Sequence, residues 1–172
     1  MAGKKKKQKV VFLDRDGVIN RDSPDYIKNW SEFEFLPGSL EALTKLTING
    51  FVVIVITNQS VIQRKMTSQK ELIPEDRCDC RKPNPGLIQK AVKKYNIELK
   101  TSTMVGDSAK DIECARNAGC GTLILVKTGN GVTAEKQLTE KMIRPDVIVR
   151  DLLEAACWIV SRNDSTFSPD PS

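Results

Sequence analysis

Apolar residues along the chain form short uninterrupted runs that alternate with segments of helical periodicity. The runs are rich in β-branched residues and contain no alternating polar positions, which is typical of strands buried on both faces of a parallel sheet. They predict strands at 10–13, 51–56, 103–105, 122–126 and 147–149. Between the runs, apolar residues recur at helical spacing, and glycine follows two of these segments as a helix stop. The segments predict helices at 39–49, 86–95, 109–118, 134–142 and 151–160.

This alternation predicts an α/β fold: a Rossmann-like parallel sheet with helices on both faces. A chain of 172 residues is long enough for one domain with a core of its own. We expect that domain at 9–160, between a disordered basic tail at 1–8 and a disordered C-terminal tail at 161–172 that is rich in Ser, Asp and Pro. Ligands of such sheets bind beyond the carboxyl ends of the strands, so the residues after each strand are the candidate site.

The net charge of +5 belongs to the N-terminal tail rather than to the domain. Residues 1–9 contain five lysines and no acid, and the remaining 22 basic residues are matched by 22 acidic ones. Binding of nucleic acid through this lysine arm is an alternative, but no aromatic residue is interleaved with the lysines. We therefore expect no nucleic-acid partner.

Membrane and secretory signals are missing from the sequence pattern. The longest apolar run, 51–56, is far below the length that spans a bilayer. The run 10–13 after the lysines is too short for the apolar region of a signal peptide. We expect a cytoplasmic monomer with no membrane partner.

The chain has no histidine and five cysteines. The missing imidazole excludes catalytic triads and histidine metal ligands, so catalysis must use carboxylates, lysines, hydroxyls or a metal held by oxygen. An odd number of cysteines without a secretory signal predicts reduced thiols. Cys114, Cys120 and Cys157 lie in helix-like or apolar surroundings and are interpreted as small core residues.

Polar and charged residues follow several of the predicted strands. They are Asp14 and Asp16 after the first strand, Thr57, Asn58, Gln59 and Ser60 after the second, Asp107 and Asp111 after the third, and the pair Arg81 and Lys82 before a proline-rich turn. Each group has a simple structural interpretation, such as a turn, a polar loop, a surface lysine or a helix cap made by Ser108 and Asp111. Their coincidence at successive strand ends favours a site for Mg²⁺ and a phosphoryl group, because hard oxygens bind the metal and cations and N–H or O–H donors bind the phosphate.

Four motifs in this order resemble the haloacid dehalogenase (HAD) superfamily. They are Phe-Leu-Asp-Arg-Asp-Gly-Val-Ile-Asn at 12–20, Thr-Asn-Gln-Ser at 57–60, Cys-Asp-Cys-Arg-Lys-Pro at 78–83 and Val-Gly-Asp at 105–107. Within the superfamily the chain is similar to the branch of D,D-heptose 1,7-bisphosphate and histidinol-phosphate phosphatases, over about residues 9 to 155. The resemblance implies a HAD-like fold with a minimal cap domain or none, since no large insert follows Asn20.

The resemblance also implies roles for the residues in these motifs. Asp14 is expected to be the nucleophile and Asp16 the general acid and base. Mg²⁺ is expected on the Asp14 carboxylate, the Asp16 main-chain carbonyl and Asp107, with Asp111 supporting the metal through water. The phosphate and substrate are expected to bind to Thr57, Asn58, Gln59, Ser60, Arg81 and Lys82.

One part of the family pattern is incomplete here. Relatives carry a long loop before the Cys-x-Cys pair, and this loop supplies two further ligands of a structural zinc site; here only 61–77 separates the motifs. Cys78 and Cys80 are thus two of the four ligands that zinc needs, which is weak support for Zn²⁺. Either the chain is shortened at an edge strand or a stretch is missing between Leu72 and Ile73, and the abrupt end of a helix-like run at Glu71 favours the second explanation.

Taken together, the motifs predict a Mg²⁺-dependent phosphomonoesterase that acts on a small phosphorylated metabolite. The first expectation is removal of the C7 phosphate of D-glycero-D-manno-heptose 1,7-bisphosphate, in the synthesis of ADP-heptose for lipopolysaccharide. The alternative is histidinol-phosphate phosphatase, which uses the same chemistry. A non-catalytic protein that binds nucleic acid through its basic tail is the third.

Overall fold

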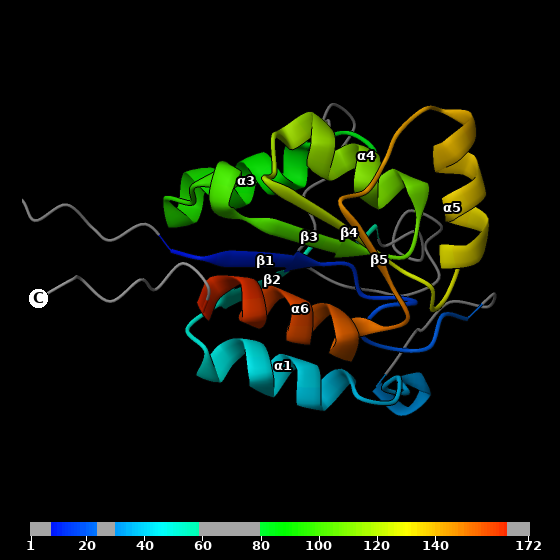
Figure 1. Cartoon of the computed structure of the whole chain (residues 1–172), viewed down its shortest axis with the longest axis horizontal. Helices are drawn as coiled ribbons and strands as arrows, with labels where there is room; N and C mark the ends of the chain where they lie inside the picture. The colour runs from blue at the N-terminus through cyan, green and yellow to red at the C-terminus, as the bar shows by residue number, and fades with distance from the viewer. Residues whose placement is uncertain (1–7, 24–29, 59–79, 165–172) are drawn as a thin grey trace, which may run out of the picture.

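Five parallel strands form one sheet in the order β2-β1-β3-β4-β5 (Figure 1). The structure is a computed structural model and describes residues 8–23, 30–58 and 80–164. The strands are β1 (Val10–Leu13), β2 (Val52–Val55), β3 (Thr103–Gly106), β4 (Thr122–Val126) and β5 (Val147–Val149). The predicted α/β fold with a parallel sheet is confirmed.

Helices cover both faces of the sheet, as Figure 1 shows. The helices are α1 (Ser39–Ile48), α3 (Gly86–Tyr95), α4 (Ala109–Ala118), α5 (Gly131–Glu140) and α6 (Leu152–Asp164). Helices α1 and α6 pack together on one face, and α3, α4 and α5 cover the other. Helix α5 begins three residues before the predicted start at 134, because its first turn follows directly from the loop after β4.

The central strand β1 belongs to both halves of the core. Val10 and Phe12 pack with the cluster under α3, α4 and α5, whereas Val11 and Leu13 pack with the cluster under α1 and α6. All four side chains are buried, which explains why the strand has no polar position. Strand β1 is therefore a rigid support for the residues that follow it, beginning with Asp14.

Strand β2 is less buried than the sequence predicts. Its uninterrupted apolar run indicated burial on both faces, but among the described residues β2 pairs only with β1 and lies at the sheet edge. Val52, Val53 and Ile54 are half-buried, and Val55 is 45% exposed. An apolar run distinguishes a strand from a turn, but it does not show how many neighbours the strand has.

The boundaries of the domain lie slightly outside the predicted ones. Gln8 forms a parallel bridge with Ile97, and α6 continues to Asp164, so 161–164 are helical rather than part of a tail. The rest of both predicted tails lies outside the described residues. The described part of the connection between β1 and α1 contains the short 3-10 helix η1 (Trp30–Glu32) and isolated β-bridges of Asn20 with Asp16 and with Phe35. Over the same described residues, no helix has the length and apolar character needed to span a membrane.

The thiols only partly follow the prediction. Cys114, Cys120 and Cys157 are free, but Cys80 is disulfide-bonded, so the prediction that all cysteines are reduced is wrong for this residue. Cys114 is buried and Cys120 is half-buried, whereas Cys157 is exposed and is not the core residue that was predicted. Burial raises the pKa of Cys114 to about 11 and that of Cys120 to about 12, so both remain neutral thiols near pH 7.

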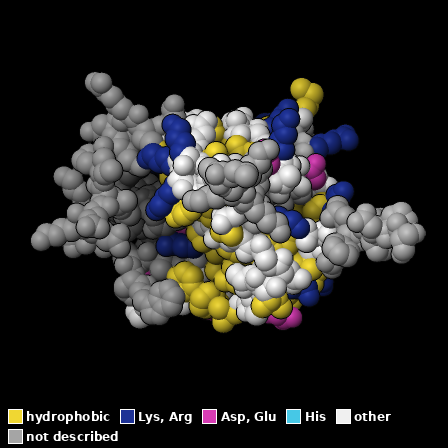
Figure 2. All heavy atoms as spheres, turned by 90° about the vertical axis from the view of Figure 1, so that its left-hand side faces the viewer, with side chains coloured by type: hydrophobic (Ala, Val, Ile, Leu, Met, Phe, Trp, Pro, Cys, Tyr) yellow, Lys and Arg dark blue, Asp and Glu magenta, His cyan; other side chains and the backbone are white. Residues whose placement is uncertain are grey.

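The strands all run towards the same edge of the sheet, and this edge carries the candidate site. Figure 2 views the opposite side, from which the strands begin, and shows lysine and arginine side chains spread among uncharged ones. The acidic motif residues Asp14 and Asp107 instead follow the carboxyl ends of β1 and β3. Parallel strands thus bring together motifs that are far apart in the sequence.

Candidate active site

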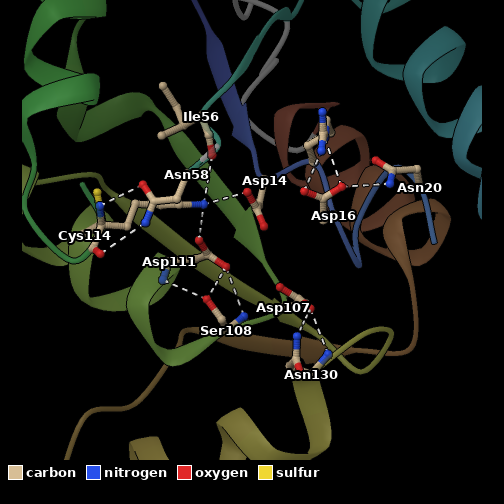
Figure 3. Close-up of polar contacts among 12 residues, drawn as sticks. Asp14, Asp16, Asn20, Ile56, Asn58, Asp107, Ser108, Asp111, Cys114 and Asn130 are labelled. Carbon is tan, nitrogen blue, oxygen red and sulfur yellow. Dashed lines mark hydrogen bonds and ion pairs between the residues drawn. The ribbon is translucent and has the colours of Figure 1, made fainter. Parts of the chain in front are cut away.

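Four charged side chains from distant parts of the chain meet at the carboxyl ends of β1 and β3. Asp14 follows β1, Asp107 follows β3, Asp111 lies in the first turn of α4 and Lys82 precedes α3. Figure 3 shows the side chains of Asp14, Asp111 and Asp107 gathered around one point of the fold. The main-chain N–H of Asp14 donates to the carbonyl of Val105 at 3.0 Å, which extends the pairing of β1 and β3 as far as the site.

Lys82 is the cation at the centre of this cluster. Its Nζ lies 2.6 Å from Asp14 Oδ1 and 2.6 Å from Asp111 Oδ1, and it donates to the carbonyl of Ile56 at 2.9 Å. Only 4% of the Lys82 side chain is exposed. Lys82 is therefore a buried, fixed ammonium group. The simpler interpretation of the sequence, a surface lysine, is wrong.

Asn58 holds the main chain of Lys82 in place. The Lys82 N–H donates to Asn58 Oδ1 at 3.0 Å, and Asn58 Nδ2 donates to the Lys82 carbonyl at 3.3 Å. The side-chain amide of Asn58 thus pairs with a peptide group as a neighbouring strand would. Asn58 therefore supports the loop that carries Lys82. The substrate contact that the resemblance implied for Asn58 stays a prediction.

Helix α4 supports the next residues of the same loop. Asn117 Nδ2 donates to the carbonyl of Pro83 at 3.2 Å, and Cys114 Sγ lies 3.2 Å from the carbonyl of Asn84. The peptide bond between Lys82 and Pro83 is cis. The loop that carries the central lysine is therefore fixed on two sides, by Asn58 and by α4.

Asp111 caps helix α4 with one carboxylate oxygen and pairs with Lys82 through the other. Its Oδ2 accepts hydrogen bonds from the N–H of Ser108 at 3.0 Å and from Ser108 Oγ at 2.7 Å, which completes a capping box at the start of α4. Its Oδ1 pairs with Lys82. The two interpretations of Asp111 are thus compatible, because each uses a different oxygen.

Asp107 is enclosed by two glycine-containing loops. Its Oδ2 accepts hydrogen bonds from the main-chain N–H and the side-chain Nδ2 of Asn130, at 2.8 and 3.2 Å. A Cβ atom on Gly17 or Gly129 would come within 2.2 or 2.1 Å of the same oxygen. Thr128 Oγ1 donates to the carbonyl of Gly17 at 2.6 Å and ties the two loops together. Asn130 was not among the predicted site residues, although its Thr-Gly-Asn-Gly segment begins two residues after a predicted strand.

The carboxylates of Asp14, Asp107 and Asp111 can offer oxygen atoms within 4.8 Å of one another. Burial, reinforced by Asp111, raises the pKa of Asp14 to about 7 despite the opposing effect of Lys82. Burial also raises the pKa of Asp107 to about 6. Burial acts to lower the pKa of Lys82, but the charges of Asp111 and Asp14 outweigh it and the net change is upward. The pocket therefore favours positive charge and disfavours three ionised acids without it.

Asp16 lies apart from this triad, with its carboxylate held by two neighbours. Arg15 donates to it through Nε at 3.0 Å and through Nη2 at 2.8 Å, and Asn20 Nδ2 donates to it at 2.9 Å. Figure 3 shows Asp16 and Asn20 on the other side of Asp14 from Asp111. About a quarter of the Asp16 side chain is exposed, so it lies at the rim of the site.

The remaining predicted site residues are only partly placed. Thr57 follows β2 and is half-buried, and Arg81 is exposed beside Lys82. Gln59, Ser60 and Cys78 lie outside the described residues. Cys80 is buried and its sulfur is engaged in a disulfide, so it offers no thiolate to a metal. Within the described ranges, the group of acids and cysteines that could hold a metal is the triad of aspartates, and zinc gains no support.

The crowding around Asp107 can be tested at Gly129. The substitution Gly129→Ala places a Cβ 2.1 Å from Asp107 Oδ2 at a residue with φ of +56°, so the carboxylate or the loop must move. We expect at least a roughly tenfold loss of Mg²⁺ affinity, measured by calorimetry. Gly50→Ala is the matched control, because Gly50 has φ of +78° but no atom within 4 Å of its added Cβ. Equal losses of affinity in both variants would show that backbone strain, and not contact with Asp107, is responsible.

Comparison with known proteins gives this arrangement a family. Residues 79–155 match the HAD-hydrolase-like family. A D-glycero-β-D-manno-heptose-1,7-bisphosphate 7-phosphatase of Pseudomonas aeruginosa is 39% identical over 158 residues, covering 76% of this chain and 88% of that protein. The chain belongs to this family of HAD-like phosphatases.

Solved structures agree with this assignment. The crystal structure of D,D-heptose 1,7-bisphosphate phosphatase from Bordetella bronchiseptica, complexed with magnesium and phosphate, matches this HAD-like phosphatase with a TM-score of 0.79 and 31% identity, covering 90% of this chain and 99% of that one. The corresponding enzyme from Burkholderia thailandensis gives a TM-score of 0.62 at 30% identity, with the same coverage.

One alignment compares the length of this chain with that of a relative. The match to the Haemophilus ducreyi enzyme, at 31% identity, spans 185 positions, more than the 172 residues of this chain. That relative therefore has residues without a counterpart in this HAD-like phosphatase.

Proposed function

We propose that this HAD-like phosphatase is a Mg²⁺-dependent phosphomonoesterase in which Asp14 is the nucleophile and Asp16 the general acid and base. The observation that carries the proposal is the contact between Asp14 and Lys82 in a buried cluster with two further aspartates. A carboxylate beside a fixed ammonium group can attack an anionic phosphoryl group, because the ammonium attracts the phosphoryl oxygens.

The donor set of the cluster fits a magnesium ion. Three carboxylates face one ammonium group, which leaves an excess of two negative charges when all are ionised. Carboxylate oxygens are the ligands that Mg²⁺ prefers, and both oxygens of Asp111 already have partners on the protein. Asp14, the main-chain carbonyl of Asp16 and Asp107 would therefore hold the ion, with Asp111 behind them. When bound, Mg²⁺ neutralises charge between the nucleophile and the phosphate.

In the first half of the reaction, an Asp14 oxygen attacks phosphorus and the bond from phosphorus to the ester oxygen breaks. Asp16 turns from Arg15 and gives its proton to the leaving alkoxide. Lys82 and Thr57 bind the phosphoryl oxygens during transfer. The product of this half is an aspartyl phosphate on Asp14 and a free alcohol.

In the second half, Asp16 takes a proton from water as the water oxygen attacks phosphorus. The bond between phosphorus and Asp14 breaks, which releases phosphate and restores the carboxylate. Each Asp16 proton transfer thus reverses the other, so the enzyme returns to its starting state. Arg15 and Asn20 support this cycle by holding the Asp16 side chain at the rim of the site.

The proposed substrate is D-glycero-D-manno-heptose 1,7-bisphosphate, cleaved at the C7 phosphate. Two findings support it: the relatives described above carry this activity in their names, and Arg81, an exposed residue beside Lys82, is of a type that suits a second phosphate or a sugar hydroxyl. These relatives give no support to histidinol phosphate. We expect the enzyme to act in the cytoplasm as a monomer.

The deciding experiment measures Mg²⁺-dependent phosphate release from the heptose bisphosphate and from L-histidinol phosphate under identical conditions. A clear preference for the bisphosphate, with one phosphate released per molecule, supports the proposal. A preference for histidinol phosphate would transfer the same residues to the alternative function. Release from neither substrate would refute both assignments.

The position of Asn58 leads to a separate expectation. Asn58→Ala removes both hydrogen bonds to the Lys82 main chain, and we expect kcat/KM to fall about tenfold to 100-fold because Lys82 loses its fixed position. The loss should be equal for the heptose bisphosphate and for p-nitrophenyl phosphate, since both need Lys82. A loss restricted to the sugar substrate would instead make Asn58 a substrate contact. Asn49→Ala is the control. It also removes an asparagine side chain that donates to a main-chain carbonyl, at the end of α1.

A further inference from the structure

Asn130 holds one oxygen of Asp107 through two hydrogen bonds. Both its main-chain N–H and its side-chain Nδ2 donate to Oδ2, as Figure 3 shows. Gly17 and Gly129 crowd the same oxygen, since neither has room for a Cβ. Asp107 is only 2% exposed. The protein therefore occupies Oδ2, and Oδ1 is the oxygen that these contacts leave for a cation.

The side chain of Asn130 bonds to Asp107 and does not cap its own helix. Asn130 is the N-cap residue of α5, but its side chain makes no capping hydrogen bond. Asparagine at this position ordinarily accepts a bond from an N–H of the first turn, which stabilises the helix. Ser108, the N-cap of α4, forms a complete capping box in the same protein. The unused cap at α5 indicates that the Asn130 side chain serves the site.

A second carboxylate lies near the same amide. Asn130 Nδ2 is 3.5 Å from Asp22 Oδ2, at the exposed rim of the site. The amide can give one hydrogen to each carboxylate without adding charge. It thus lies between two negative groups that would otherwise face each other directly.

We propose that Asn130 is a positioning residue for the divalent cation, which fixes Asp107 Oδ2 so that Oδ1 is presented to Mg²⁺. This inference rests on the magnesium site of the proposed function and adds to it a residue outside the recognised motifs. Partners that hold a metal-binding carboxylate or imidazole in one orientation typically change metal affinity by about tenfold to 100-fold. Since the main-chain bond of Asn130 remains in any substitution, we expect the lower end of that range.

The test compares Mg²⁺ binding to the wild-type protein and to Asn130→Ala by calorimetry, with no substrate present. We expect the Kd for Mg²⁺ to rise about tenfold in the variant. At saturating Mg²⁺, kcat should return to within about threefold of the wild-type value, since Asn130 acts through the metal. Asn130 is exposed, so its truncation should leave the fold intact, and the unfolding temperature of the metal-free variant checks this. Asn49→Ala again serves as the control, at a helix end remote from the site.

Two results would overturn the inference alone, and a third would overturn it together with the proposed function. An unchanged Kd for Mg²⁺ in Asn130→Ala would show that Asp107 does not need the Asn130 side chain to hold the cation. A tenfold loss in kcat that persists at saturating Mg²⁺ would place Asn130 in a role other than metal positioning. A wild-type protein that binds no Mg²⁺ would overturn the magnesium site of the proposed function along with the inference, and so differs from a failure of Asn130 alone.

Discussion

Asp14→Asn should abolish phosphate release, with a fall in kcat of about 10⁴-fold or more. The amide that replaces the carboxylate is a very weak nucleophile, and no described carboxylate can take its place. Asp111 has both oxygens engaged by Lys82 and Ser108, and Asp107 has one oxygen engaged by Asn130. A residual rate from bound water would remain far below the wild-type rate.

The same substitution should leave the fold intact. Asparagine has nearly the size of aspartate, the main-chain bond from residue 14 to Val105 is unaffected, and Lys82 retains Asp111 and the carbonyl of Ile56 as partners. Circular dichroism and the unfolding temperature check this expectation. Asp146→Asn is a useful control, because Asp146 binds the N–H of Leu123 away from the site and its variant should keep full turnover. An Asp14→Asn enzyme with most of its activity would require a different nucleophile.

The fold could be predicted from the sequence because the sheet is parallel and its central strands are buried on both faces. Phe12 and Leu13 point to opposite faces and meet apolar layers on each, so no polar residue interrupts β1. The order of the strands and the edge position of β2 could not be predicted in this way. They depend on which strands pair. Val55 is as apolar as a residue of a central strand, although it is 45% exposed in the edge strand β2.

The site was predictable where a residue directly follows a strand. Asp14 and Asp107 are placed by β1 and β3 themselves, so the end of each apolar run located them. Asn58 and Asn130 are different, since their roles depend on contacts with Lys82 and Asp107 across the fold. Local spacing does not encode such contacts, and an asparagine in a loop also fits a simple turn.

The side-chain partner of Arg15 could not be predicted from the sequence either. It lies between the two aspartates of the first motif, yet its side chain pairs with Asp16 and not with Asp14, which has Lys82 as its partner. The direction of each side chain after β1 decides this pairing, and adjacency in the sequence is compatible with either. A three-dimensional arrangement was needed to separate the buried Asp14 from Asp16 at the rim.

Of the proposed substitutions, Lys82→Ala should lower the free energy of unfolding most. It should also severely reduce turnover. The substitution leaves Asp14 and Asp111 in a buried site without the ammonium group that lies 2.6 Å from each. Breaking a buried pair by removal of one partner typically costs about 3–5 kcal/mol in the free energy of unfolding. Loss of the charge that binds the phosphoryl oxygens should also lower kcat/KM at least about 100-fold. Urea unfolding in EDTA measures the first effect without interference from bound metal.

The dependence of that destabilisation on pH identifies its cause. Burial already raises the pKa of Asp14 from 3.8 to about 7, and removal of Lys82 takes away an interaction that lowers it. A carboxyl whose pKa is higher in the folded state binds more protons there, so stability falls as the pH rises from about 4 through the folded-state pKa. The deficit of Lys82→Ala relative to wild type should therefore be larger at pH 8 than at pH 5.

Lys127→Ala provides the matched comparison, because Lys127 forms a largely exposed pair with Glu135 at 3.4 Å. Its loss should cost less than about 1 kcal/mol at either pH, since water screens both charges. If Lys82→Ala were equally destabilised at pH 5 and pH 8, lost packing of the buried alkyl chain would explain the effect, and the ammonium group would not be the charge that stabilises the acidic cluster. A deficit that grows with pH in Lys82→Ala alone assigns that charge to Lys82, which is the same property the proposed reaction requires of it.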